Sequence, residues 1–405
     1  MILSARRSLA AVTGLGVTQI VSYGTLYYSF SILEPAMAQE FGQSRQWLFA
    51  AFSGTLLVGG IISPWSGRWA DRFGAGRVMT FGSLAAALSL ILCVLSQKWI
   101  WFAPALVTTG MATPFILYNT AFAVLVQIDP QTASRRITYL TLIAGFSSTL
   151  FWPLATHLLT VFTWREIYLF YAGLQVFICF PIHFWLSQMT RRSPKLREDE
   201  NADEAVRGVS GQLPLESRRS ALLLIMAGFS LASFSLSAML VHLVPVLAAV
   251  GVGTSAVLVG AIFGPSQFAA RLVNMVFGNK LSAMAIAVLS TALIPLSFLM
   301  LIVPLPVPLV VGAVMFAMLF GMGSGLNSIV QGTLPLALFG HHGYGEILGK
   351  ITSARLIVSS SAPFIFAFIM EKLGPKLALS VAAMVGVLGV LTFLTVASLV
   401  RRSTQ

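Results

Sequence analysis

Long apolar segments, each close to the length needed to cross a lipid bilayer, follow one another through the whole chain. A spanning helix needs roughly 20 apolar residues to cross about 30 Å of hydrocarbon. A backbone in lipid must also satisfy its own hydrogen bonds, which favours helices. The sequence therefore predicts an all-α membrane protein with twelve transmembrane helices, at 9–37, 46–66, 78–97, 100–127, 138–161, 166–188, 220–249, 254–277, 282–302, 306–334, 347–370 and 376–400.

The composition excludes an ordinary soluble protein. Of the 405 residues, 57% are hydrophobic and 9% are charged, whereas a soluble domain carries about 25% charged residues. The formal charge of +12 would suit a protein that binds nucleic acid, but the basic residues are scattered at the ends of apolar segments. We therefore expect the lipid bilayer as a partner and no nucleic acid.

The same basic residues predict the orientation of the chain, because short cytoplasmic loops carry an excess of lysine and arginine. With a cytoplasmic amino terminus, most of them fall on the inner side, including the pairs 6–7, 135–136, 191–192 and 401–402. An even number of helices then places both termini in the cytoplasm. We expect an integral protein of a bacterial inner (plasma) membrane.

A charged segment rich in glycine and proline divides the chain into halves. Residues 191–219 are too polar to enter the bilayer and have little apolar material for a core. They are predicted to be a cytoplasmic linker between an N-terminal six-helix bundle (1–190) and a C-terminal six-helix bundle (220–405). Ala144–Pro153 and Ala354–Pro363 share the frame Ala-x8-Pro at corresponding positions, as expected for the internal repeats of carriers.

A charged turn is expected between the second and third apolar segments, at Gly67–Arg77. Its spacing, Gly-x3-Asp-Arg-x-Gly-x2-Arg, resembles the signature loop of the major facilitator superfamily. The resemblance implies a carrier built from two pseudo-symmetric six-helix bundles, and a conformational latch formed by Gly67, Asp71, Arg72, Gly74 and Arg77. Gly76 departs from the pattern, which usually has a basic residue there. The alternative is an ordinary positively charged inner turn.

The first two helices carry a further resemblance. Tyr23–Phe30, Glu40–Arg45 and Ala51–Ser53 resemble the start of the monocarboxylate porter and oxalate/formate antiporter group. The chain departs from the animal monocarboxylate porters at Gln267, because those proteins have an aspartate before the arginine of the eighth helix. The resemblance implies a small carboxylate as the substrate.

Arg271 and Arg355 lie inside apolar segments, which makes them the main candidates for substrate binding. An arginine at mid-bilayer costs at least ~2.5–3.5 kcal/mol on insertion scales, so it normally faces a wet cavity or a partner. Gln267 shares a helix face with Arg271. Two fixed cations suit a carboxylate, which arginine can bind with two hydrogen bonds. Oxalate/formate antiporters also carry cations on helices eight and eleven. Alternatively, the arginines reach the interface or bond backbone carbonyls.

Weaker candidates are polar or aromatic residues that interrupt apolar helices. They are Tyr23, Tyr27, Tyr118, Asn119, His242 and Asn327. Each could instead pack within the bundle, and the glycines that precede Asn327 are typical of close helix packing.

We predict a secondary active or facilitative carrier of a small organic anion, a mono- or dicarboxylate, that works by alternating access as a monomer. The alternatives are a multidrug-type efflux carrier of hydrophobic compounds and a transport-inactive membrane sensor. An enzyme is not expected, because no P-loop or nucleophile–base arrangement is found. Cys93 and Cys179 have no metal-ligand spacing, so neither a metal nor a cofactor is predicted.

The mode of energy coupling stays open at this level. Proton-driven carriers usually keep a carboxylate deep within a helix. Here the acidic residues of the apolar part are expected near helix boundaries, at Glu34, Asp71, Asp129, Glu166, Glu346 and Glu371. This favours anion exchange, facilitated flux, or protonation of His242 or of the substrate.

Overall fold

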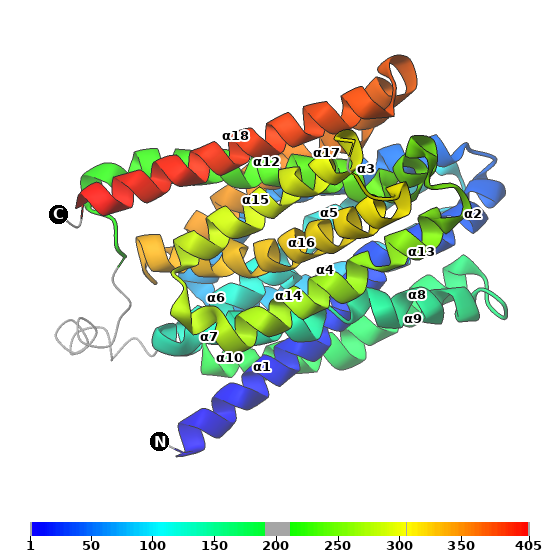
Figure 1. Cartoon of the computed structure of the whole chain (residues 1–405). Helices are drawn as coiled ribbons and strands as arrows, with labels where there is room; N and C mark the ends of the chain where they lie inside the picture. The colour runs from blue at the N-terminus through cyan, green and yellow to red at the C-terminus, as the bar shows by residue number, and fades with distance from the viewer. Residues whose placement is uncertain (1, 191–210, 305, 404–405) are drawn as a thin grey trace. The chain divides into compact units, whose positions relative to one another are not determined.

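The structure is a computed structural model that describes residues 2–190, 211–304 and 306–403. The regular elements in these ranges are helices (Figure 1), which confirms the predicted all-α class. By their contacts, the residues group into two compact units. Unit 1 comprises Met1–Ser210 and Gly340–Ser353, and unit 2 comprises Gly211–Phe339 and Ala354–Gln405.

Unit 1 contains the helices of the first half of the chain and the beginning of α17. Its elements are α1 (Ile2–Tyr23), η1 (Gly24–Tyr28), α2 (Phe30–Phe41), α3 (Arg45–Phe73), α4 (Ala75–Leu95), α5 (Trp99–Ile116), α6 (Tyr118–Ile128), α7 (Pro130–Ala144), α8 (Ser147–Leu158), α9 (Trp164–Leu174), η2 (Gln175–Cys179) and α10 (Phe180–Met189).

Unit 2 contains the helices of the second half, with α17 shared between the units. The elements are α12 (Leu215–Leu247), η4 (Ala248–Val252), η5 (Gly253–Ser255), α13 (Ala256–Ala261), α14 (Phe263–Phe277), η6 (Gly278–Lys280), α15 (Ala283–Ile302), α16 (Leu309–Phe339), α17 (Tyr344–Leu373) and α18 (Pro375–Ser403).

Eleven helices of the described ranges are long and apolar enough to cross a membrane. The remaining predicted span, 254–277, is present as α13 and α14, which are interrupted at Ile262. Neither piece reaches the length of a spanning helix by itself, but together they cover the predicted segment. The helical segments therefore follow the predicted order through the described chain.

The predicted turn at Gly67–Arg77 is wrong in its conformation, because most of this segment is helical. The helix α3 continues to Phe73 and α4 begins at Ala75, so the chain reverses at Gly74. Gly74 has a φ of 92°, a conformation that glycine adopts without steric cost. Asp71 and Arg72 consequently occupy the last turn of a helix.

The first transmembrane segment also extends further than predicted. The π-helical segment η1 joins α1 to α2, and α2 ends at Phe41 because Gly42, with a φ of 59°, provides a left-handed cap. Glu34 therefore lies about two turns before the end of the segment, where its side chain is fully buried. The expectation that it sits at a helix boundary is wrong.

The predicted linker is described in part. Residues 191–210 lie outside the described residues. Downstream, Pro214 immediately precedes α12, which begins at Leu215 within the range predicted as linker. Glu216 in the first turn is favourable there, because the amino terminus of a helix attracts negative charge.

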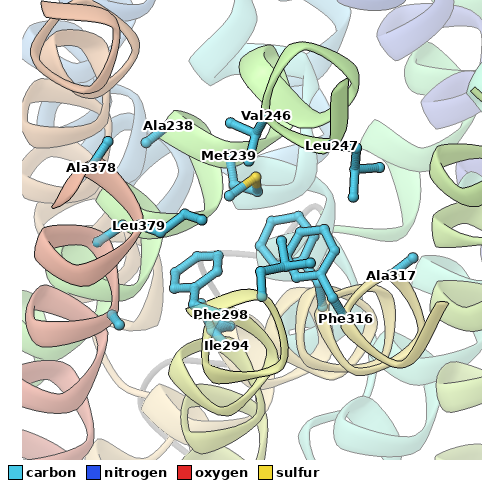
Figure 2. Packing of buried hydrophobic residues seen from close by; sticks show 14 of the residues in the cluster. Ala238, Met239, Val246, Leu247, Ile294, Phe298, Phe316, Ala317, Ala378 and Leu379 are labelled. Carbon is cyan, nitrogen blue, oxygen red and sulfur yellow. The ribbon is translucent and has the colours of Figure 1, made fainter. Parts of the chain in front are cut away.

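An apolar core holds α12, α15, α16 and α18 together in unit 2 (Figure 2). The ring of Phe298 on α15 lies 6.3 Å from that of Phe316 and 5.9 Å from that of Phe320, both on α16. The helices α12 and α18 run side by side (Figure 1), and Ser235 Oγ donates a hydrogen bond of 2.9 Å to the carbonyl of Ala382. This packing fixes α16, which carries partners of the buried arginine described next.

Candidate functional site

Arg271 lies on α14 and is 5% exposed. Its Nε donates hydrogen bonds to Ser328 Oγ at 3.2 Å and to the Gly325 carbonyl at 3.4 Å, both on α16. Ser328 Oγ in turn donates to the Gly325 carbonyl at 2.7 Å. Neutral oxygens of one neighbouring helix thus orient the guanidinium group within unit 2.

Close packing of α14 on α16 brings Arg271 to these acceptors. A Cβ atom on Gly321 would lie 2.5 Å from the Phe263 carbonyl, and one on Gly325 would lie 2.4 Å from the Gln267 carbonyl. Glycines four residues apart therefore allow the two backbones to touch. Gln267 Nε2 also donates to Ser324 Oγ at 2.9 Å, so the structure brings Gln267 and Arg271 to the same stretch of α16.

Asn327 belongs to a different face of α16. Helical spacing places it with Gly323, where an added Cβ would lie 3.0 Å from the Ser290 carbonyl on α15. Its side chain is buried, and Oδ1 has no hydrogen-bond partner within the described ranges. The structure thus places Asn327 on the side facing α15.

Arg355 is half-buried on α17, two turns before Pro363. Proline has no N–H, so Pro363 leaves the Ser359 carbonyl without its helical donor. Ser237 Oγ of α12 fills this role with a hydrogen bond of 3.1 Å. Arg355, Ser359 and Pro363 are spaced by four, so they share one helix face.

His242 also contacts α17. Its Nε2 donates to the Pro363 carbonyl at 3.0 Å, and its ring stacks on Phe366 with centroids 5.5 Å apart. The structure therefore ties His242 to the proline-containing part of the helix that carries Arg355.

Three of the tyrosines singled out from the sequence lie in one aromatic cluster of unit 1. The ring of Tyr23 is 4.9 Å from that of Tyr118 and 6.2 Å from that of Tyr28. Tyr27 contacts Tyr28 at 5.3 Å and Phe52 at 5.5 Å. The cluster joins the first, second and fourth predicted transmembrane segments.

Asn119 lies beside this cluster, in the first turn of α6. Its Oδ1 accepts a hydrogen bond of 2.8 Å from Thr352 Oγ1, in the part of α17 that belongs to unit 1. The interruption between α5 and α6 at Leu117 precedes it directly.

The hydrogen bonds that stabilise this interruption could not be predicted from the sequence. The Pro114 carbonyl accepts hydrogen bonds of 2.7 Å from both Ser66 Oγ and Thr120 Oγ1. Gln19 Nε2 donates to the Ile116 carbonyl at 2.7 Å. Backbone groups freed in a membrane helix need such partners. The signals in the sequence were Pro104 and Pro114 within α5 and the polar residue Gln19 in an apolar helix.

Asp71 binds the amino terminus of α17 within unit 1. Its Oδ1 accepts from the Gly345 amide at 3.0 Å, and Oδ2 accepts from the Glu346 amide at 2.8 Å. These amides belong to the helix terminus that carries partial positive charge and lacks intrahelical acceptors. A carboxylate is therefore well matched to this position.

Glycines allow α3 to approach α17 at the same place. A Cβ atom on Gly67 would lie 2.1 Å from the Gly345 carbonyl, and one on Gly349 would lie 2.5 Å from the Ser63 carbonyl. Ser63, Gly67 and Asp71 are spaced by four along α3 and thus form one contact stripe.

The other predicted latch residues are arranged differently. Arg72 is exposed, and its guanidinium lies 5.2 Å from the ring centroid of Phe73. Arg77 is half-buried on α4, and Gly74 makes the turn. Of the predicted set, Gly67 and Asp71 make the contacts with α17.

A residue outside the signature, Gln127 of α6, joins the two ends of the α3–α4 turn. Its Nε2 donates to the Ala70 carbonyl at 2.9 Å, and its Oε1 accepts from the Ala75 amide at 2.8 Å. Nothing in the local sequence pattern indicates this role, because the contact spans about fifty residues.

The structure explains why Gly76 departs from the family pattern. A Cβ atom there would lie 2.6 Å from the backbone of Ser187 on α10, and the Gly76 amide donates to Thr190 Oγ1 at 3.2 Å. The close approach of α10 leaves no space for a basic side chain.

Replacing Gln127 by alanine is expected to lower the free energy of unfolding by about 1–3 kcal/mol, because two hydrogen bonds at helix ends are lost. Thermal unfolding of the purified protein measures the effect. Gln39→Ala, at an exposed position of α2, is the control and should change stability by less than about 0.5 kcal/mol. Equal effects of the two substitutions would contradict this role of Gln127.

Comparisons with known proteins agree with the fold. The sequence profile of the Major Facilitator Superfamily matches residues 15–363. The human organic anion transporter MFSD10 (TETRAN) has a similar structure, with a TM-score of 0.67 and 14% identity over 96% of this chain and 99% of that chain. The proton:xylose symporter XylE, bound to 6-bromo-6-deoxy-D-glucose, gives a TM-score of 0.68 and 11% identity over 96% and 95% of the two chains. No protein of curated function matches the sequence.

Apolar helices of spanning length and the family match indicate an integral membrane transporter. The chain belongs to the major facilitator superfamily. The two similar structures have low sequence identity, so they show the fold and not the substrate.

Proposed function

We propose that this transporter carries a small organic anion, a mono- or dicarboxylate, by alternating access. The observation that carries the proposal is the burial of Arg271 within a membrane helix, oriented through Nε by neutral oxygens of α16. Arginine keeps its charge at any physiological pH, and its planar group matches a carboxylate in shape and charge. In this proposal, the carboxylate of the substrate binds the guanidinium group of Arg271.

The charge distribution of unit 2 supports an anionic substrate. In the sequence of this unit, the acidic residues are Glu216 and Glu371, near the ends of α12 and α17. Arg271 and Arg355 lie within its apolar segments. A surplus of positive charge inside a low-dielectric region attracts anions and repels cations. This also disfavours a carrier of cationic drugs.

Arg355 has a supporting role in this proposal. The proline-containing part of α17 is held by Ser237 and His242, and Arg355 shares the face of Ser359 and Pro363. Movement of this part of the helix would move the second guanidinium group.

MFSD10 is described as an organic anion transporter, which is compatible with the proposal, whereas XylE is described as a xylose symporter.

The contact between Asp71 and α17 is proposed to act as the conformational latch that the family resemblance implies. A carboxylate stabilises a helix only when it lies close to the amino terminus, because the favourable field of the helix dipole falls off within about one turn. The bonds of Asp71 would therefore exist in one conformational state and be lost in another.

Membership of the monocarboxylate porter or oxalate/formate antiporter group, cytoplasmic termini and a monomeric state stay predictions.

The proposed substrate class is tested by adding formate, acetate, lactate, oxalate and succinate to the purified protein and measuring thermal stability. A ligand present at 100 times its Kd stabilises the folded state by about 2.7 kcal/mol. Xylose and tetraphenylphosphonium serve as neutral and cationic controls. We expect stabilisation by at least one carboxylate and by neither control, followed by flux of that carboxylate in proteoliposomes.

Two outcomes would contradict the proposal. Stabilisation by the cation alone would favour a drug efflux carrier. Binding of a carboxylate without flux would favour a transport-inactive sensor.

A further inference from the structure

One face of α8, in unit 1, borders an open cavity. The cavity has a volume of about 710 Å³, within the range of about 300–1,000 Å³ that is usual for small-molecule sites. It is lined by Trp152, Pro153, His157 and four hydroxyl residues, among them Thr156 and Thr160. The lining residues belong to α8 or follow it closely, and their spacing of three or four places them on one side of the helix.

The polar lining indicates a cavity that holds water rather than lipid tails. The helix α8 belongs to the apolar stretch Pro130–Leu158, which is long enough to cross a membrane. Polar and ionisable side chains in such a stretch usually face the interior of the bundle or a water-filled cavity. On α8, Thr149, Thr156 and His157 are exposed. A dissolved compound can therefore reach this face of the helix.

The surface of the cavity nevertheless consists mainly of carbon atoms. Thr156 Oγ1 donates to the Trp152 carbonyl at 2.9 Å, and Thr160 Oγ1 donates to the His157 carbonyl at 2.7 Å. A hydroxyl group has a single proton to donate, so these two have none left for a ligand. The lining residues include no lysine, arginine, aspartate or glutamate. The cavity therefore suits an uncharged group with a large apolar surface.

Trp152 provides an apolar surface that is held in one orientation. The residue is 48% exposed, and its Nε1 donates to the Tyr28 carbonyl of η1 at 3.2 Å. The rings of Trp152 and Tyr28 meet edge to face, with centroids 6.0 Å apart and planes at 86°. Tyr23 and Tyr27 contact the Tyr28 ring in turn. Because the indole has one donor and uses it within the protein, the exposed part of its ring offers a π surface.

A planar aromatic ring matches this surface better than other uncharged groups do. A sugar needs several hydrogen-bond donors beside the tryptophan, and the hydroxyl protons of Thr156 and Thr160 are already bound to the backbone. A saturated ring would bury a similar area but would lack the attraction between aromatic rings. The fixed orientation of Trp152 also reduces the conformational freedom lost on binding.

We propose that the cavity on α8 is a binding site for small aromatic compounds, whose uncharged ring packs against Trp152. The contact between aromatic rings favours such a ring over a saturated ring of the same size by about 2- to 10-fold in affinity. The site consists of residues of unit 1 and does not depend on Arg271 or on the anion proposed above. It gives the transporter an affinity for neutral aromatic compounds as well.

The first test compares benzamide with cyclohexanecarboxamide, which have equal numbers of heavy atoms and no charge. The dissociation constants follow from the concentration dependence of the thermal stability of the full-length protein in detergent. We expect benzamide to bind about 2- to 10-fold more tightly, although partition into detergent favours the more apolar saturated ring. Trp152→Leu should abolish this preference.

Further variants separate the ring from its hydrogen bond. Trp152→Phe keeps an aromatic ring but loses the bond to the Tyr28 carbonyl, and it should retain the preference for benzamide. Trp101→Leu removes a tryptophan of α5 that is 67% exposed, and it is the matched control with no expected change. Arg271→Gln should bind benzamide as the unsubstituted protein does.

The second test locates the site by photolabelling the full-length protein with 4-azidobenzamide and identifying the labelled peptides by mass spectrometry. We expect label within residues 147–160, and we expect excess benzamide to reduce it more than cyclohexanecarboxamide does. The labelling uses the unsubstituted protein, so it decides the location even if Trp152→Leu folds poorly.

Three results would each overturn the proposal. They are a preference for benzamide that survives in folded Trp152→Leu, binding of the saturated amide at least as tight as that of benzamide, and protectable label confined to other parts of the chain. If benzamide binds at α8 but no carboxylate binds the protein, the anionic substrate is wrong and the aromatic site stands.

Discussion

Replacing Arg271 by glutamine is expected to weaken carboxylate binding by at least about 30-fold, equivalent to about 2 kcal/mol. Truncating one partner of a buried, hydrogen-bonded charge pair typically costs about 2–5 kcal/mol. Glutamine can still donate to Ser328 or to the Gly325 carbonyl, so the packing of α14 on α16 should survive. The dissociation constant of the tightest carboxylate of the panel, measured by calorimetry, checks the prediction.

Two further variants separate charge from geometry. Arg271→Lys keeps the positive charge but loses the planar group that binds both oxygens of a carboxylate, so we expect an intermediate loss of affinity. Arg68→Gln removes an exposed charge on α3 and should leave affinity within about twofold, because exposed charges are screened by water and salt. Unchanged binding by Arg271→Gln would remove the basis for the anionic substrate.

The transmembrane segments could be predicted from the sequence because their signal is local. Twenty consecutive apolar residues are sufficient to identify a spanning helix, and each predicted segment has helical counterparts in the described chain. Helix ends were less predictable. The charged end of α3 was predicted to be a turn, although polar residues can prolong a helix beyond the hydrocarbon. Glu34 was predicted to lie near a helix end because the segment was expected to end near residue 37.

The site depends on contacts between distant parts of the chain, which a single sequence does not contain. The pattern around Asp71 indicated a functional segment, but the backbone amides of Gly345 and Glu346 that donate to its carboxylate become visible only when α3 packs on α17. Gln127 and the ion pair of Glu34 with Arg45 could not be recognised either. A buried arginine was easier to find, because a charge within an apolar segment costs free energy in any side-chain orientation.

Replacing Gly67 by alanine is expected to detach the first turn of α17 from α3. The added Cβ would lie 2.1 Å from the Gly345 carbonyl, which is backbone and cannot rotate away. The helices must therefore separate, and the bonds from Gly345 and Glu346 to Asp71 should be lost together. Hydrogen exchange at these two amides should accelerate about 10- to 100-fold, equivalent to about 1.4–2.8 kcal/mol, which agrees with the usual cost of overpacking.

Gly54→Ala is the matched control on the same helix. The nearest atom to its added Cβ is a side-chain methyl group of Val107 at 3.3 Å, which can shift slightly, so exchange at Gly345 and Glu346 should not change. Asp71→Asn keeps one acceptor oxygen and the close approach of the backbones, and should therefore have a smaller effect than Gly67→Ala. If Asp71→Asn instead accelerated exchange more, the charge at the helix terminus would matter more than the glycine contact.

If the contact favours one conformational state, a loss of 1.4 kcal/mol shifts the populations about tenfold, and the transport rate should change in Gly67→Ala but not in Gly54→Ala.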